Sequence, residues 1–209
     1  MPMNSLLLAI EPLEPGAKDS LMQWRASDGQ TFDLSKAVEL SRFRSVEPTG
    51  EAPELLELYE VLDGDAVRAA NAAGAQPVAE PALESIRAVY LPLIEMPEEK
   101  SSSASSAPAL LIVGLNIDET HDEEFQEWYN VEHLPRLVAV PGVLRARRYR
   151  LHGQIGDGRG ATQYLALYDL DDVEVPNSDP WREAVETPWR NRMRRLFTGN
   201  RLYGRYQRD

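Results

Sequence analysis

The chain has 209 residues, a formal net charge of −12 at pH 7 and no cysteine. A chain of this length with 43% hydrophobic residues can bury one large core or two small ones. The lack of cysteine excludes disulfides, thiolate catalysis and cysteine-ligated metal sites. The negative charge argues against nucleic-acid and membrane partners, because phosphate backbones and anionic lipids are themselves negative.

Targeting signals are not expected. The longest apolar runs, Leu6–Ile10 and Ala109–Leu115, are far shorter than the roughly 20 residues that span a bilayer. No basic segment precedes the first of them, so a secretory signal is not predicted. We therefore expect a globular protein of the cytoplasm.

The first half of the chain alternates between strand and helix patterns. Strands are predicted at Ser5–Glu11, Glu39–Val46, Glu54–Leu62 and Ser85–Met96, and helices at Asp19–Ala26 and Gly64–Ala75. Pro97–Pro108, with the sequence PEEKSSSASSAP, has no apolar periodicity and is typical of a linker. Residues 98–107 should be mobile, because ordering them would cost conformational entropy that no apolar contact offsets.

The second half repeats this order. Strands are predicted at Ala109–Ile117, Val143–Leu151, Thr162–Leu170 and Arg201–Gln207, and helices at His121–His133 and Pro180–Phe197. Short matches link the halves at rising offsets of 104, 106 and 109 residues: Trp24 with Trp128, Arg42-Phe43-Arg44 with Arg148-Tyr149-Arg150, and Leu58-Tyr59-Glu60 with Leu167-Tyr168-Asp169. We therefore predict an α+β fold with two tandem βαββαβ, ferredoxin-like units at 1–96 and 109–209, joined by a linker at 97–108. Their sheets should face each other, since the strands carry apolar residues on both sides.

The segment Trp128–Pro135, WYNVEHLP, is the most informative stretch of the sequence. Thr120 and Glu123 have capping-box spacing, which predicts a helix start near residue 121. On that helix Phe125, Trp128, Tyr129 and Glu132 would share one face. Pro135 lacks an N–H group, so the helix is expected to kink or stop around His133 and leave His133 near a helix C-terminus.

These residues carry a resemblance to a known family. EFQEWYNVEHLPRLVAVPGVLRARRYR, followed by QYLALYDL, resembles the EthD-like group of the dimeric α/β barrel superfamily, whose helix has a W-Y-x-x-E-H-x-P pattern before a P-G-x turn. The resemblance covers about residues 109–206 and implies an intramolecular barrel built from both units. Superfamily members include cofactor-free monooxygenases, polyketide cyclases, muconolactone isomerases and haem-binding enzymes. The first half has Arg25–Gly29 in place of Tyr129–His133, which makes it the degenerate copy.

His133 is the candidate acid or base, because an imidazole with a pKa of about 6.5 exchanges protons near neutrality. Its alternative role is a helix cap. Glu132 is the second catalytic candidate, flanking a cleft with His133, and its alternative is an ion pair with Arg136. Metal binding is not predicted, since adjacent helical residues diverge by about 100°.

The candidate ligand contacts are mostly aromatic. Trp128, Tyr129, Tyr149 and Tyr168 are predicted to line a pocket for an aromatic ligand, with core packing as the alternative. Arg147 belongs to an arginine-rich set in the second half and is a candidate anion contact, or else part of a solvated surface. Trp181, Val185, Trp189, Met193 and Leu196 are spaced as the buried stripe of the last helix.

We therefore expect a small-molecule enzyme or binding protein for an aromatic or polyketide-like ligand, without an organic cofactor and with His133 as acid or base. The alternatives are a noncatalytic scaffold or interaction protein of the same fold, and a haem-binding protein. The protein should be a monomer or a homodimer.

Overall fold

The structure is a computed structural model that describes residues 5–11, 23–25, 31–33, 39–46, 55–61, 86–97, 106–155 and 161–209. Its largest element is a closed antiparallel barrel with the strand order β1-β5-β4-β10-β7-β9-β8-β6. The strands are β1 (Ser5–Glu11), β4 (Glu39–Ser45), β5 (Leu55–Val61), β6 (Ile86–Met96), β7 (Ala109–Ile117), β8 (Val143–Ile155), β9 (Tyr164–Leu170) and β10 (Phe197–Arg208). All eight strands predicted from the sequence are present, and the α+β class is confirmed.

The order of the strands divides the barrel into two runs. The first-half strands lie in the order β6-β1-β5-β4, and the second-half strands in the corresponding order β10-β7-β9-β8. Antiparallel pairing of β10 with β4 and of β6 with β8 joins the two runs. The two halves of the chain are therefore linked by backbone hydrogen bonds along both seams of the barrel.

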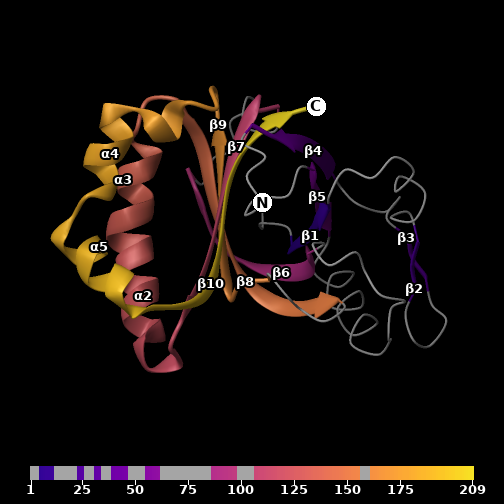
Figure 1. Cartoon of the computed structure of the whole chain (residues 1–209), viewed down its shortest axis with the longest axis horizontal. Helices are drawn as coiled ribbons and strands as arrows, with labels where there is room; N and C mark the ends of the chain where they lie inside the picture. Colours follow the sequence, from indigo (N-terminus) through magenta and orange to yellow (C-terminus); the bar gives the residue numbers. More distant parts are fainter. Residues whose placement is uncertain are drawn as a thin grey trace.

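Helices cover the outside of the second run (Figure 1). They are α2 (Asp122–Trp128), α3 (Leu134–Val138), α4 (Asp179–Val185) and α5 (Pro188–Met193), with short 3₁₀ turns at Glu119–His121, Val175–Asn177 and Arg194–Leu196. Among the described residues, no helix is both long enough and apolar enough to cross a membrane.

Side chains alternate along each strand between two cores. Leu110, Ile112 and Leu165 point into the barrel, where every strand of the barrel contributes a buried side chain. Their neighbours Ala109 and Leu111 point outward into a second core beneath the helices. The second-half strands are therefore buried on both faces, as their sequence pattern predicts.

The helix that carries WYNVEHLP differs from its prediction in two ways. Asp118, and not Thr120, forms the N-cap, because its carboxylate accepts a hydrogen bond from the Thr120 N–H at 2.9 Å. The helix also does not stop at His133 but runs on to Val138 through a π-helical turn at Tyr129–His133. In that turn the Leu134 N–H bonds the Tyr129 carbonyl, five residues back. The wider turn accommodates Pro135, so His133 lies inside a helix and does not cap its end.

The last helix is also divided. We predicted one helix over Pro180–Phe197, but Glu186 and Thr187 are extended and separate α4 from α5. Pro188 explains the break, because it favours an extended residue before it and is tolerated only in the first turn of a new helix. The predicted buried stripe nevertheless packs in the outer core, with Trp181 and Met193 fully buried.

In the first half, the helix predicted at Asp19–Ala26 is wrong at 23–25. These residues form strand β2 (Gln23–Arg25), which pairs with β3 (Thr31–Asp33). Trp24, Thr31 and Phe32 are residue types that favour strands. The other predicted first-half helix, Gly64–Ala75, lies outside the described residues.

The linker is described only at its ends. The prediction of mobility fails at Ala107, which is fully buried and whose carbonyl accepts a hydrogen bond from Arg208 Nε at 2.8 Å. The preceding residues 98–105 lie outside the described part of the chain.

Candidate functional site

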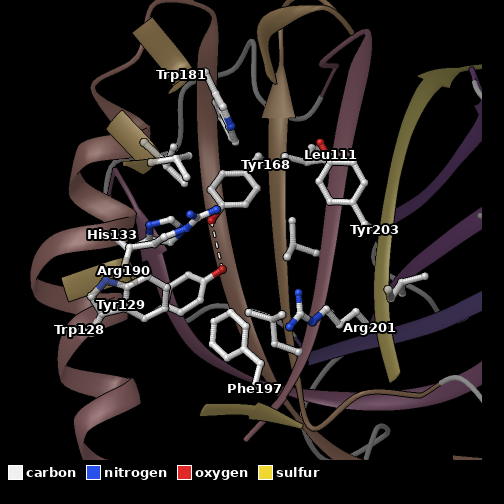
Figure 2. A pocket seen from close by; sticks show the side chains of 16 residues that line it. Leu111, Trp128, Tyr129, His133, Tyr168, Trp181, Arg190, Phe197, Arg201 and Tyr203 are labelled. Atoms are coloured by element: carbon white, nitrogen blue, oxygen red, sulfur yellow. Dashed lines mark hydrogen bonds between the residues drawn. The ribbon is translucent and has the colours of Figure 1, made fainter. Parts of the chain in front are cut away.

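A pocket of about 420 Å³ lies between the helices and the outer face of β7, β9 and β10. His133, Trp128, Tyr129 and Tyr168, four of the seven predicted site residues, border it together. The other lining side chains come from the strands, from α3 and from the last helices: Leu111, Val113, Leu115, Leu137, Trp181, Val185, Arg190, Phe197, Arg201, Leu202 and Tyr203, with Gly114 between them. Figure 2 shows His133 and Arg190 on the helical side, and Arg201 and Tyr203 on the opposite side.

The π-helical turn decides which motif side chains face this pocket. A π turn brings residues five apart close to alignment, whereas an α-helix aligns residues three and four apart. His133 accordingly stacks on Trp128, with ring centroids 4.5 Å apart, and meets the edge of Tyr129 at 5.0 Å. In a regular α-helix Glu132 would share the face of Trp128 and Tyr129, which was the prediction. The extra residue in the turn gives that position to His133.

The environment of His133 keeps its imidazole neutral. Burial, followed by the positive charges of Arg190, Arg148 and Arg136, lowers the pKa of His133 to about 3. Within the described part of the chain, no hydrogen bond engages its ring nitrogens. The imidazole can therefore accept or share a hydrogen bond with a ligand, but it is not an imidazolium acid near neutrality. This corrects the expectation of a pKa near 6.5.

A pair of tyrosine hydroxyls forms the polar part of the pocket wall. Tyr129 and Tyr168 approach to 3.3 Å between their hydroxyl oxygens. Burial raises the pKa of both, so both stay protonated. The guanidinium of Arg148 lies 4.0 Å from the centroid of the Tyr129 ring. Arg148 supports this wall from behind, where Asn130 and Gln126 accept its hydrogen bonds at 2.5 and 3.0 Å.

Glu132 is not part of the pocket lining, contrary to the prediction that it flanks a cleft with His133. Its carboxylate accepts a hydrogen bond from Thr187 Oγ1 at 2.6 Å. Thr187 is the N-cap of α5, and its Oγ1 also accepts from the Arg190 N–H at 3.0 Å. Glu132 therefore ties the motif helix to the start of α5, and the predicted Glu132–Arg136 pair does not form: Arg136 bonds the carbonyls of Ala184 and Glu183.

This arrangement predicts a stability difference between two N-caps. Ser178 caps α4 with a hydrogen bond to the Trp181 N–H, and Ser178→Ala should lower the free energy of unfolding by about 1 kcal/mol. Thr187→Ala should cost about 1–2 kcal/mol, because it removes a cap and also leaves Glu132 without its donor. Urea unfolding curves measure both. Thr187→Ser keeps the hydroxyl, so its free energy of unfolding should stay close to that of the wild type. If Thr187→Ser lowered the free energy of unfolding as much as Thr187→Ala does, the role of the Thr187 hydroxyl as N-cap and donor to Glu132 would be contradicted.

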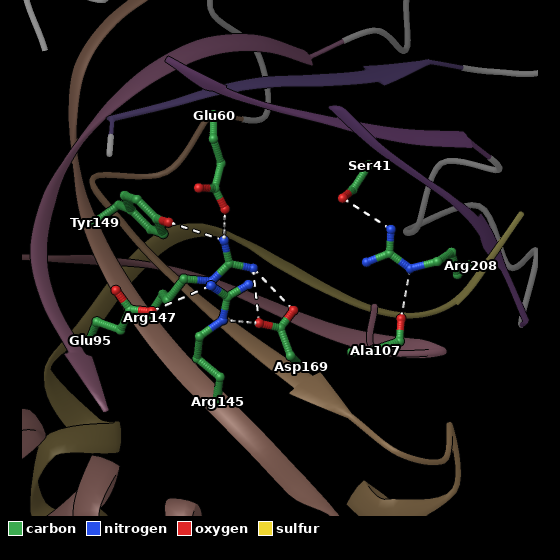
Figure 3. A network of polar contacts seen from close by, with 9 residues as sticks. All are labelled: Ser41, Glu60, Glu95, Ala107, Arg145, Arg147, Tyr149, Asp169 and Arg208. Carbon is green, nitrogen blue, oxygen red and sulfur yellow. Dashed lines mark hydrogen bonds and ion pairs between the residues drawn. The ribbon is translucent and has the colours of Figure 1, made fainter. Parts of the chain in front are cut away.

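Two predicted ligand contacts, Arg147 and Tyr149, lie on the other side of the sheet. They point into the barrel, because β8 alternates its side chains and Arg148 takes the outward position. Arg147 donates to Glu60 at 2.6 Å and to Asp169 at 3.0 Å, and Arg145 donates to Asp169 at 2.5 Å (Figure 3). Burial alone would lower the pKa of Arg147, but Asp169, then Tyr149 and Glu60, outweigh it and raise the pKa.

This network is therefore a junction between the two halves of the chain. Arg145, Arg147 and Asp169 belong to the second half, whereas Glu60 and Glu95 belong to the first. All five side chains are at most 10% exposed, so Arg147 is neither part of a solvated surface nor a contact of the pocket.

The sequence analysis did not predict the residues that β10 contributes to the pocket. Arg201 and Tyr203 come from β10, whose pairing with β7 shifts register between Thr198 and Leu202. Both side chains lie on the outward face of β10, which also carries Phe197, and the pairing of β10 with β7 brings them into one pocket with the motif residues. Arg190 belongs to the arginine-rich set of the second half, from which only Arg147 was predicted as a ligand contact. Among the described residues, no cluster of three histidine or acidic side chains is placed to hold a metal ion.

Comparisons with known proteins place the fold but not the family. No protein-family model matches the sequence, and no curated protein matches it. Solved structures do match. The chain is similar to an anthrone oxidase-like protein at 9% identity and a TM-score of 0.59, covering 99% of this chain and 91% of the other.

Two further solved structures are from Listeria monocytogenes. One, from strain 4b F2365, is an uncharacterized ferredoxin-fold protein related to antibiotic biosynthesis monooxygenases. It matches at 9% identity and a TM-score of 0.55, and the match covers 100% of this chain and 96% of that chain. The other is a heme-degrading enzyme, which matches at 8% identity and a TM-score of 0.51. This match covers 97% of this chain and 98% of that chain. At these identities the likeness establishes the fold alone, a ferredoxin-like fold.

Proposed function

We propose that the protein binds an aromatic, polyketide-like small molecule in the pocket between the helices and β7, β9 and β10. The observation that carries the proposal is the combination of a cavity of about 420 Å³, walls of Trp128, Tyr129 and Trp181, and a neutral imidazole at His133. Cavities of roughly 300–1,000 Å³ with aromatic walls and a few polar groups are typical ligand sites. The names of the structural neighbours, which include an anthrone oxidase-like protein, support a fused-ring ligand.

In this proposal the ligand lies against Trp128 and Tyr129, and His133 shares a hydrogen bond with its phenol or enol. A neutral imidazole with a pKa of about 3 accepts a hydrogen bond from the ligand without taking its proton, and it orients the ligand hydroxyl. The proposed role of His133 is therefore that of a hydrogen-bond acceptor, and Glu132 has a positioning role through Thr187.

We also infer that the chain contains two ferredoxin-like units at 1–96 and 109–209 and belongs to the EthD-like group. The matching strand orders of the two halves support the first inference. So do the sequence matches: Phe43 and Tyr149, and likewise Leu58 and Leu167, occupy corresponding strands and the same barrel core. The WYNVEHLP motif supports the second inference.

A ligand titration tests the proposed function. 1,8-Dihydroxyanthrone should raise the melting temperature in proportion to its affinity, because a ligand that binds only the folded state stabilises it. His133→Gln and Tyr168→Phe should each weaken binding about tenfold, the loss expected for one hydrogen bond. Arg182→Gln, an exposed change on α4 whose side chain does not line the pocket, is the control. Absence of any stabilisation by fused-ring phenols would refute the proposal.

The second candidate is haem binding. It is favoured by the neutral imidazole of His133, which has no hydrogen-bond partner in the described part of the chain, and by the likeness to a heme-degrading enzyme. His133 is the residue that would hold the iron. Haem titration should then give a Soret band that His133→Gln removes, and no band would exclude haem. A scaffold without a ligand site is disfavoured, because His133 borders a cavity.

A further inference from the structure

The pocket is lined by positive charge, although the protein as a whole carries −12. Arg190 and Arg201 are its charged lining residues, and no aspartate or glutamate lines it. Figure 2 shows the two guanidinium groups entering from opposite sides, Arg190 from the helices and Arg201 from β10. If the ligand were a fused aromatic hydrocarbon, both guanidinium groups would face an apolar surface.

Neither guanidinium is neutralised inside the pocket. Arg201 has no carboxylate partner among the described residues, and its guanidinium lies over the Phe197 ring at 5.3 Å. Arg190 donates to Glu186 at 3.0 Å and to Asn191 Oδ1 at 3.2 Å, in both cases through Nη1. Its Nε and Nη2 donors have no partner among the described residues, so they remain available to a ligand.

A third cation strengthens the positive potential from behind the wall. Arg148 is 1% exposed, and its described hydrogen-bond partners, Asn130 and Gln126, are neutral amides. Asp122 acts on Arg148 through space, but its described hydrogen bonds come from Tyr164 and Gln126. Arg148 and Arg190 both act electrostatically on His133 in the pocket wall, so an anion in the pocket would be stabilised by their charges as well as by that of Arg201.

The tyrosine pair adds a directed donor. Two hydroxyls carry two hydrogens, and the contact between Tyr129 and Tyr168 uses only one of them. The second hydrogen has no acceptor among the described residues and can bond a carbonyl or phenolic oxygen of a ligand. The pocket therefore offers an anion site and a hydrogen-bond donor within the same aromatic walls.

We propose that the ligand of this pocket is an aromatic acid, whose ionised group is held between Arg190 and Arg201 while a ring oxygen accepts from the Tyr129–Tyr168 pair. The inference rests on the proposed function and adds the charge of the ligand to it. Arg190 and Arg201 are the residues that select an acid over a neutral ligand of the same shape.

The test compares two ligands of nearly identical shape, 1-hydroxy-2-naphthoate and 1-hydroxy-2-naphthamide, by isothermal titration calorimetry. The wild type should bind the acid about 10–100-fold more tightly, the range for hydrogen bonds to a charged group. Arg190→Gln and Arg201→Gln should each reduce this ratio about tenfold and leave amide binding nearly unchanged. Arg192→Gln, an exposed change on α5 outside this pocket, should preserve the ratio.

NMR titration of His133 gives a second readout. Bound acid should raise the pKa of His133, because an anion favours the imidazolium, whereas bound amide should not. Equal affinity of the wild type for acid and amide would overturn this inference and leave the aromatic pocket in place. A ratio unchanged in both arginine variants would also overturn it. No binding of either ligand, or of the fused-ring phenols, would refute the proposed function itself.

Discussion

Asp169→Asn should lower the free energy of unfolding by about 3–5 kcal/mol, the loss typical of removing one charge from a buried network. Asp169 is 1% exposed and accepts hydrogen bonds from both Arg145 and Arg147. The substitution keeps the shape of the side chain but removes its charge, and it leaves two buried guanidinium groups with only Glu60 and Glu95. The remaining carboxylates come from the other half of the chain, so both guanidinium groups lose their only carboxylate partner from their own half.

Urea unfolding at neutral pH measures this loss. Asp179→Asn is the matched control, since Asp179 pairs with Arg182 on the surface and its removal should cost under about 1 kcal/mol. Equal losses for Asp169→Asn and Asp179→Asn would show that the network contributes no more than a surface ion pair.

His133 should make the folded protein sensitive to acid. In the folded state the pKa of His133 is about 3, whereas an unfolded histidine titrates near 6.5. The unfolded chain therefore binds the proton more readily, and stability is lost as pH falls below 6.5. Each pH unit should cost about 1.4 kcal/mol, or about 2 kcal/mol between pH 6.5 and 5, rising toward about 4 kcal/mol near pH 3.

The comparison that isolates this effect is His133→Gln, which carries no titrating group. Between pH 6.5 and 5, the free energy of unfolding of His133→Gln should fall by about 2 kcal/mol less than that of the wild type. The imidazole resonances of wild-type His133 should show no protonation step above about pH 4. A titration midpoint near 6.5 in the folded protein would contradict the burial and charge environment described for this site.

Local chemistry in the sequence was sufficient to predict the eight strands of the barrel, but not β2 and β3. Residues 109–117, for example, form one apolar run whose neighbours face opposite cores, and its bounds are those predicted. The sequence also identified the motif helix and four side chains of the pocket, because Trp128, Tyr129 and His133 lie within six residues and Tyr168 lies on an adjacent strongly apolar strand.

The tertiary structure decided the remaining features, since they depend on contacts between distant parts of the chain. The π-helical turn places His133, and not Glu132, on the face with Trp128, and no periodicity argument based on 3.6 residues per turn predicts that exchange. The inward direction of Arg147 depends on how β8 sits in the closed barrel, where Glu60 and Asp169 surround its charge. Arg201 meets the motif residues in one pocket because β10 pairs with β7, a contact between distant parts of the chain. The sequence thus determined which side chains were available for a site, and packing across the barrel determined which of them meet.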